Sequence, residues 1–375
     1  MSRRGNVENV DLFKLIVNGS YLLSAIKRLL GGIMIKIVLD GMGSDQHPDP
    51  EVEAAVQASL QFNAEIILVG KEELLKPRLE QVYKRTSGAE RASVRIVHAP
   101  QVLEMTDKPT ENIRGEAKHS MAVGMDLLRQ SEAQAFVTAG NTGGAMATAL
   151  YRLGRIRGVR RPALTALFPV AGGKKTVVLD IGANAECKPE FLVQFAALGY
   201  LYAQKILHIE NPKVGLLSNG EEAGKGNELV KQTYPLLEKS GLNFIGNVEG
   251  KELFGGAVDV VVTDGFSGNI LLKTSEAVAK LMVDLLKQEL LSSWQTKIGA
   301  LLAKPAFDAL KKLLDPAEIG AAPLLGVNGL VFVGHGRSDS RALVNGVGVA
   351  VQAVNSGLLE AMRAAIQKQL ASGEE

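Results

Sequence analysis

The sequence is poor in cysteine, in net charge and in long apolar runs. Its 375 residues include one cysteine, Cys187, so no intramolecular disulfide can form and no Cys/His metal cluster is available. This usage is typical of a reducing cytoplasm, and we expect Cys187 to be an ordinary buried thiol. Because 42 basic residues nearly balance 40 acidic ones, no global positive field favours nucleic acid as a partner. No apolar run reaches the ~18 residues that a membrane-spanning helix needs.

Glycine, in contrast, is abundant. The chain has 40 glycines, above the share of ~7% that is typical of proteins, and they show no Gly-X-Y period. Collagen is therefore excluded and many tight backbone turns are expected. A hydrophobic content of 46% excludes a disordered chain. The length allows two domains or one large α/β unit.

The first 33 residues are interrupted by charges and carry no small-residue cleavage site, so a secretory signal is not expected. Gly31 and Gly32 stand just before Met34, as they do where a purine-rich ribosome-binding stretch is translated in frame. We therefore expect Met34 to be the natural start and residues 1–33 to be an N-terminal extension from a misassigned start. Residues 34–375 are then expected to form a single catalytic α/β domain.

From residue 35 onward, short β-branched runs alternate with segments of helical period. This pattern predicts a large, mostly parallel sheet flanked by helices. The expected strands are residues 35–39, 65–69, 93–98, 133–138, 176–179, 213–217, 244–248, 259–263 and 330–333. The clearest helices are expected at residues 51–61, 120–129, 190–204 and 226–239.

Most of the expected strands lead into short polar loops rich in Gly, Asp and Asn. In open α/β sheets, ligands bind at the carboxyl ends of the strands, so several such loops are expected to meet at one edge and build one polar site. A single loop of this kind is more often a plain turn with a helix cap. The loops are DGMGSD (40–45), GNTGG (140–144), DIGAN (180–184), NGEE (219–222), DGFSGN (264–269) and GHGRSD (334–339).

The loop at 140–144 precedes a helical segment, and free N–H groups at a helix N-terminus bind phosphate or carboxylate. Walker A, G-x-G-x-x-G, HExxH and G-x-S-x-G motifs are missing, which disfavours ATP, NAD, a required metal and a serine hydrolase. Asp40, Asp45, Asp180 and Asp264 remain open between metal ligand, acid/base group and holder of loop amides. His335 suits proton donation to a substrate or a structural role.

Eight strings resemble one family. They are DGMGSD (40–45), AGNTGG (139–144), RPAL (161–164), LDIGANAECKPEFLVQFAALG (179–199), KGNEL (225–229), FIGNVEG (244–250), DVVVTDGFSGNILLK (259–273) and APLLGVNG (322–329). Together they resemble the bacterial phosphate acyltransferases of phospholipid synthesis, in order along nearly all of the chain after Met34.

The resemblance implies transfer of a long fatty acyl group from acyl carrier protein to inorganic phosphate, without a cofactor. The acyl phosphate would serve a membrane-bound glycerol-3-phosphate acyltransferase on the way to phosphatidic acid. It also implies a homodimer and a fold similar to the isocitrate and isopropylmalate dehydrogenases and to phosphotransacetylase. We expect the protein in the cytoplasm, peripherally associated with the inner face of the cell membrane.

Such a reaction needs no covalent intermediate, because phosphate is itself a nucleophile, and positioning and oxyanion stabilisation suffice. Asn amides would hold the phosphate and the oxyanion, a lysine would neutralise charge, and His335 would protonate the thiolate. The candidate catalytic residues are Asn184, Lys225, Asn227, Asp264, Asn269 and His335. The candidate phosphate and substrate residues are Asp40, Gly43, Asp45, Gly140, Asn141, Thr142, Gly143, Gly182, Gly265, Gly268 and Lys273.

A run of arginines follows the predicted anion loop. It is either a solvated loop or, as the family favours, a dock for an acidic carrier protein. The residues are Arg152, Arg155, Arg157, Arg160 and Arg161.

Residues 276–315 are expected to form an amphipathic hairpin that Pro305 breaks into two helices. We expect residues 281–290 to be core or dimer interface, and residues 291–314 to be core, dimer interface or a membrane contact. The candidate membrane residues are Leu291, Trp294, Ile298, Leu302, Phe307, Lys304, Lys311 and Lys312.

Two other functions compete with acyl transfer. A dehydrogenase of the isocitrate or isopropylmalate type is disfavoured by the absence of clustered metal-binding aspartates and of an adenine-binding segment. A non-catalytic scaffold for membrane or carrier leaves the many polar strand-end loops unexplained.

Overall fold

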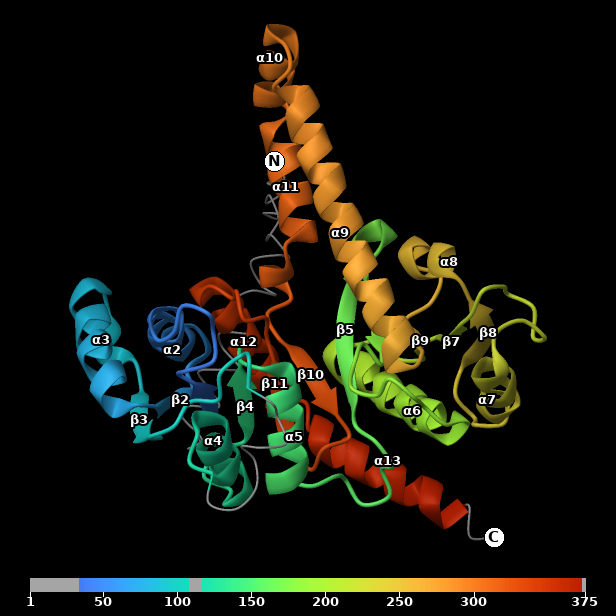
Figure 1. Cartoon of the computed structure of the whole chain (residues 1–375), viewed down its shortest axis with the longest axis horizontal. Helices are drawn as coiled ribbons and strands as arrows, with labels where there is room; N and C mark the ends of the chain where they lie inside the picture. The colour runs from blue at the N-terminus through green and yellow to red at the C-terminus, as the bar shows by residue number, and fades with distance from the viewer. Residues whose placement is uncertain (1–33, 108–116, 373–375) are drawn as a thin grey trace, which may run out of the picture. The chain divides into compact units, whose positions relative to one another are not determined.

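Eleven strands form one sheet in the computed structural model, which describes residues 34–107 and 117–372 (Figure 1). Their spatial order is β3-β2-β1-β4-β11-β10-β5-β6-β9-β7-β8. They are β1 (Lys36–Asp40), β2 (Glu65–Gly70), β3 (Val94–His98), β4 (Ala135–Thr138), β5 (Ala163–Pro169), β6 (Lys175–Leu179), β7 (Val214–Leu217), β8 (Phe244–Val248), β9 (Val260–Val262), β10 (Ala322–Leu325) and β11 (Leu330–Val333). All nine predicted strands are present. The expectation about residues 1–33 lies outside the described residues.

Strands β5 and β10 were not predicted, and they change the topology. Both are antiparallel to their neighbours, whereas the other pairings are parallel. Strand β10 pairs through Ala322 and Pro323 with β11 and through Leu324 and Leu325 with β5, so the missing N–H of Pro323 affects one ladder only. Because β10 and β5 reverse direction, β6 to β9 run opposite to β1 to β4. The carboxyl ends of β1, β4 and β11 therefore lie at one edge of the sheet and those of β6, β7 and β9 at the other, so the loops do not share one edge as a single set.

The sheet is covered on both faces. Successive side chains of a strand point to opposite faces, and in β1 Ile37 and Leu39 enter one hydrophobic cluster while Val38 enters the other. Helices α2, α3, α6, α7, α12 and α13 contribute to the first cluster, and α4, α5 and α8 to the second. The helices are α2 (Asp49–Phe62), α3 (Glu72–Arg85), α4 (Ser120–Arg129), α5 (Thr142–Arg152), α6 (Pro189–Ile206), α7 (Glu228–Glu238), α8 (Gly250–Gly255), α9 (Gly265–Leu290), α10 (Trp294–Leu302), α11 (Lys304–Leu314), α12 (Ser340–Asn355) and α13 (Leu358–Ser372).

Many of the strand-end Asp and Asn residues cap the next helix. The side chains of Asn141, Asn227, Asp264 and Asp339 accept hydrogen bonds from the first turns of α5, α7, α9 and α12. This explains why such residues recur at equivalent positions, since a side-chain oxygen at the N-cap satisfies an otherwise unpaired N–H.

The predicted hairpin is present, but it has three helices rather than two (Figure 1). Helix α9 ends at Leu290, and Ser293 starts α10 by accepting a hydrogen bond from the Thr296 N–H at 3.2 Å. Pro305 lies in the first turn of α11, where its missing N–H has no cost. We call residues 281–314 the arm. Figure 1 shows it extending away from the sheet.

The arm is exposed in this chain. Leu281, Leu285 and Leu286 are exposed to solvent. The expectation that residues 281–290 belong to the core of the chain is therefore wrong. Their role as a dimer interface stays a prediction.

Among the described residues, no single helix is long and apolar enough to cross a membrane. One pair bent by 54°, Ser340–Asn355 with Leu358–Lys368, meets the requirement by length and composition only.

Candidate active site

A cleft of about 530 Å³ lies over β5 and β10 and is closed on its sides by α9 and the end of α11. Its walls are mainly apolar, with Leu164, Phe168, Leu272, Leu313 and Leu324 among them. One part of the lining is polar, and it includes residues that the sequence singled out. The residues singled out are Thr142, Gly143, Gly182, Asn269, Lys273 and His335, and Glu276 lies beside them in the lining.

Two groups of loops reach this cleft from the two halves of the sheet. In the first group, the N–H of Asp45 donates to the carbonyl of Gly336 at 2.7 Å. Gly43 lies against the 138–140 segment, where a Cβ atom would come within 2.9 Å of the Gly140 nitrogen. This group presents Thr142, Gly143 and His335 to the cleft. The second group consists of the loops at 180–184 and 264–269.

Asp40 serves the first group as a buried anchor. Its carboxylate accepts hydrogen bonds from the Thr138 hydroxyl at 2.7 Å and from the Met42 N–H at 3.1 Å. The Thr138 hydroxyl oxygen in turn accepts from the Gly140 N–H at 2.9 Å. Burial raises the pKa of Asp40 above its ordinary value. Asp40 is therefore placed to hold the loops rather than to contact a ligand.

The N-terminus of α5 lies at the cleft. The Asn141 side chain accepts from the Gly144 N–H at 2.9 Å and donates to the carbonyl of Met105 at 3.0 Å, which fixes the loop. The N–H groups of Thr142 and Gly143 are the first two of the helix and have no acceptor within it. Because both residues line the cleft, an anion there would meet these donors and the positive end of the helix dipole.

The loop at 180–184 is built around Asp180. This carboxylate accepts from the backbone N–H groups of Leu164, Gly182, Ala183 and Asn184 at 2.7–3.2 Å. The Asn184 side chain donates to Asp180 Oδ2 at 2.9 Å and to the carbonyl of Pro162 at 2.7 Å. Burial raises the pKa of Asp180, although these hydrogen bonds act in the opposite direction. Because Asn184 is bonded within the loop, the structure places it as a holder of the loop.

Helix α9 begins against this loop and carries the polar stripe of the cleft. The Asp264 carboxylate accepts from the Ser267 N–H at 2.9 Å and from its hydroxyl at 2.8 Å. Gly265 and Gly268 permit the close approach, since a Cβ atom on Gly265 would come within 2.6 Å of the Asn184 carbonyl oxygen. Asn269, Lys273 and Glu276 line the cleft from one face of the helix, since Lys273 lies four residues and Glu276 seven residues after Asn269.

Glu276 is the site residue that sequence reasoning missed. Its carboxylate lies 3.1 Å from Lys273 Nζ and 3.7 Å from His335 Nε2. Burial lowers the pKa of His335, while the charge of Glu276 acts to raise it. The spacing of Asn269, Lys273 and Glu276 on one face of α9 was the available signal.

Lys225 and Asn227 lie outside the lining of this cleft. Asn227 caps α7, accepting from the Val230 N–H at 3.0 Å, and Lys225 packs near Gly220. Their predicted catalytic roles stay predictions without support from this geometry.

The predicted docking arginines separate into two sets. Arg155, Arg160 and Arg161 line a second hollow, of about 1150 Å³, together with Lys188 and Lys239. Arg157 is outside its lining.

Arg152 is not part of an exposed docking surface. Its side chain is 12% exposed, pairs with Asp126 at 3.2 Å and donates to the carbonyl of Ala117 at 2.9 Å. The prediction for Arg152 was wrong because a run of arginines in a sequence does not reveal which one packs inward.

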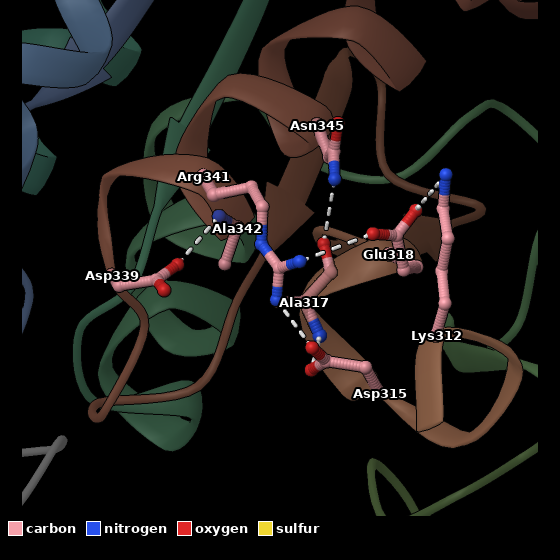
Figure 2. Close-up of polar contacts among 8 residues, drawn as sticks. All are labelled: Lys312, Asp315, Ala317, Glu318, Asp339, Arg341, Ala342 and Asn345. Atoms are coloured by element: carbon pink, nitrogen blue, oxygen red, sulfur yellow. Dashed lines mark hydrogen bonds and ion pairs between the residues drawn. The ribbon is translucent and has the colours of Figure 1, made fainter. Parts of the chain in front are cut away.

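Polar contacts hold the end of α11 and the residues after it against α12, as Figure 2 shows. Arg341 of α12 pairs with Asp315 and, at 3.3 Å, with Glu318. Lys312 lies 4.0 Å from Glu318, and Asn345 Nδ2 donates to the carbonyl of Ala317 at 2.8 Å. Since Leu313, Leu314 and Asp315 line the cleft, these contacts hold one of its walls.

The candidate membrane residues lie along the outer arm. Leu291, Trp294, Ile298 and Leu302 are exposed, as are the three lysines, whereas Phe307 is half-buried. The lysines are Lys304, Lys311 and Lys312.

Cys187 is an unreactive thiol in this setting. It is half-buried, its sulfur lies 3.6 Å from the Asn184 carbonyl, and burial raises the pKa of Cys187 to about 12. A thiol that stays protonated at neutral pH is a poor nucleophile.

One carboxylate group among the described residues has metal-like spacing. The ligand atoms of Glu221, Glu249 and Glu252 lie within 4.8 Å of one another. The Lys251 ammonium group lies 2.5 Å from Glu221 and 3.5 Å from Glu249, so a cation already balances this cluster.

Comparison with solved structures defines the fold. A phosphotransacetylase from Streptococcus pyogenes matches with a TM-score of 0.57 at 16% identity, over 86% of this chain and 95% of its own. A branched-chain phosphotransacylase from Enterococcus faecalis matches with a TM-score of 0.50 at 15% identity, over 86% of this chain and all of its own. The fold is thus that of the phosphotransacetylases, as predicted. The expected likeness to the isocitrate and isopropylmalate dehydrogenases stays a prediction.

Sequence comparison defines the family. Residues 35–361 match the model of the family described as fatty acid synthesis protein. The chain is 47% identical over 333 residues to a phosphate acyltransferase of Pelotomaculum thermopropionicum, covering 89% of this chain and 95% of the relative. It is 45% identical over 332 residues to one of Acidobacterium capsulatum, covering 88% and 97%. The chain belongs to the phosphate acyltransferase family and is an acyltransferase of lipid biosynthesis.

Proposed function

We propose that this enzyme transfers a long-chain fatty acyl group from acyl carrier protein to inorganic phosphate. The observation that carries the proposal is the two-part lining of the cleft. Apolar side chains from β5, α9 and α11 suit an acyl chain, and the first turn of α5 with Lys273 suits a phosphate. A volume of about 530 Å³ is within the range of small-molecule sites. The acyl phosphate would supply phosphatidic acid synthesis.

The proposed mechanism is direct attack of phosphate on the thioester. The N–H groups of Thr142 and Gly143 and the ammonium group of Lys273 hold phosphate, and the Asn269 amide lies on the opposite wall for the oxyanion. No acyl-enzyme is formed, in keeping with the protonated state of Cys187.

Carrier protein would dock at the second hollow, which we call the basic hollow because Arg155, Arg160, Arg161, Lys188 and Lys239 line it. Its cations lie on the 154–162 loop and at the ends of α6 and α7. The Arg160 N–H donates to Gln194 Oε1 at 2.8 Å, and Gln194 Nε2 donates to the carbonyl of Gly158 at 2.9 Å, which fixes the loop. Pro162 lines the hollow and also bonds to Asn184 of the cleft loop. An acidic partner bound there would sit beside the cleft.

The arm would contact the membrane and, nearer the sheet, a second copy of the chain. Trp294 is 70% exposed, and leucines with neighbouring lysines continue along α10 and α11. Such a helix pair suits the anionic inner face of the cell membrane, where a membrane-bound glycerol-3-phosphate acyltransferase would use the product. The exposed leucines of α9 suit a homodimer contact nearer the sheet.

The alternative of an NAD(P)-dependent dehydrogenase is not favoured, because the family is one of acyltransferases. One assay separates the functions. The protein is incubated with palmitoyl carrier protein and phosphate, and acyl phosphate is trapped as hydroxamate. Phosphate-dependent hydroxamate supports the proposal, whereas palmitate in its place, or no reaction, would refute it.

A further inference from the structure

Glu276 stands between the Lys273 ammonium group and the His335 imidazole at the polar end of the cleft. It lies on α9, 3.1 Å from Lys273 Nζ one turn away, and 3.7 Å from His335 Nε2, which comes from the loop after β11. The Glu276 side chain is 24% exposed, less than either partner. One carboxylate therefore bridges two elements that belong to opposite halves of the sheet.

We propose that Glu276 is a positioning residue for acyl transfer, holding the Lys273 ammonium group and the His335 imidazole in place for the reaction. The proposal rests on the proposed function, and it assigns to Glu276 a role that acts through its two neighbours, Lys273 and His335. Lys273 and His335 both line the cleft, where the proposed mechanism has Lys273 hold the phosphate and His335 carry the proton.

The step balances with the groups already present. Attack of HPO₄²⁻ forms a bond between phosphate oxygen and the acyl carbon, and the bond between that carbon and sulfur breaks. The phosphate loses one proton and the leaving thiolate gains one, so the net charge of −2 is kept. A neutral His335 takes the proton from phosphate and returns it to sulfur, and it ends unchanged.

The imidazolium that forms in this relay needs a neighbouring negative charge. Lys273 from α9 and Arg337 from the same loop as His335 both oppose protonation of the ring. Asp315 lines the cleft, and Asp45 packs against Gly336. Among the described residues, Glu276 is the carboxylate at ion-pair distance from His335. It thus stabilises the imidazolium as the carboxylate of a catalytic triad does.

The test is Glu276→Gln in the full chain, which keeps the size of the side chain and removes its charge. Glu289→Gln is the matched control, because it removes the same charge from an exposed site about 20 Å further along α9. The ring of His335 is titrated by NMR, with His335→Gln identifying its signal. In Glu276→Gln we expect the pKa of His335 to fall by about half a unit or more, because a stabilising negative charge is lost. The control should leave it unchanged.

Kinetics give the second readout. We expect Glu276→Gln to lower kcat about tenfold or more, with a change in KM for phosphate of less than about threefold. Glu276→Asp, which keeps the charge, should recover part of kcat. If the wild type makes acyl phosphate but Glu276→Gln changes neither the His335 titration nor kcat, the inference about Glu276 is overturned. The proposed function then still stands. A wild type that makes no acyl phosphate would overturn the proposed function and this inference with it.

Discussion

Gly268 of α9 lies against the carbonyl oxygen of Asp180, so closely that a Cβ atom would come within 1.9 Å of it. This contact joins the first turn of α9 to the loop that closes one side of the cleft. The position of Asn269, Lys273 and Glu276 therefore depends on a residue without a side chain at position 268.

We expect Gly268→Ala to destabilise the protein by about 3 kcal/mol and to abolish most activity, because backbone atoms must move to admit the methyl group. Gly299→Ala is the control, since Gly299 lies within α10 with no atom in reach of an added Cβ. Gly299→Ala should raise the free energy of unfolding by about 0.5–1 kcal/mol, which is the difference in helix propensity between Gly and Ala. Urea unfolding and the hydroxamate assay measure both. Equal effects of the two changes would contradict this view of the α9 contact.

Local patterns revealed most of the secondary structure but not the direction of half of the sheet. β-branched runs such as the Val260–Val262 strand are local signals, and all nine that were predicted are present. Strand β10 is short and contains Pro323, and β5 lacks Val and Ile and ends in Pro169, so neither has the usual strand signature. Their antiparallel pairing depends on contacts between distant segments.

The same limit applied to the site. Thr142, Gly143 and His335 were predicted from loop chemistry, Asn269 and Lys273 from the reaction that the family resemblance implies, and all five line one cleft. Glu276 was overlooked because a glutamate three residues after a lysine is an ordinary helix pair. Its link to His335 appears only when β11 and α9 are brought together in the fold.

Glu51 should make stability depend on pH. It is fully buried, Oε1 accepts from the Ser44 N–H at 2.7 Å, and Oε2 has no partner among the described residues. Burial raises the pKa of Glu51 to about 7 from 4.5. A raised carboxyl pKa means that the folded state holds the proton more tightly, so stability falls as pH rises from about 4.5 through about 7.

Glu51→Gln removes this titration. We expect the loss of unfolding free energy between pH 5 and pH 8 to be smaller in the variant by about 2–3 kcal/mol, at 1.36 kcal/mol per pH unit. Urea unfolding at several pH values measures it. Parallel pH curves for the wild type and the variant would show that Glu51 is already ionised at pH 5.

If carrier protein docks at the basic hollow, reversing the charge of its arginines should weaken binding. Reversing Arg160 and Arg161 to Glu should raise KM for acyl carrier protein tenfold or more, with a smaller effect on kcat, because encounter and docking are weakened. Arg157→Glu changes an arginine outside the hollow and should have less effect. Steady-state kinetics at low salt would show the difference. An equal rise in KM for both variants would point to general charge rather than to this hollow.

We expect the tip of the arm to bind membranes and to contribute little to the stability of the fold. Leu301 is 72% and Leu302 79% exposed, so replacing both by Ser should change stability by no more than about 0.5 kcal/mol. Each leucine withdrawn from an apolar phase costs about 1.5–3 kcal/mol, so flotation with anionic vesicles should fall more than tenfold. Leu236→Ser, on α7, is the control. Flotation that survives the double change would exclude the tip of the arm as the contact.

Direct attack of phosphate at the cleft is tested by one single-turnover measurement. Enzyme in excess is mixed with palmitoyl carrier protein and ¹⁸O-labelled phosphate, and mass spectrometry follows the small molecules and the intact protein. We expect labelled palmitoyl phosphate to form at the rate at which the thioester disappears, with no change in the mass of the enzyme. Loss of thioester with a palmitoylated enzyme, or with palmitate in place of palmitoyl phosphate, would contradict the account.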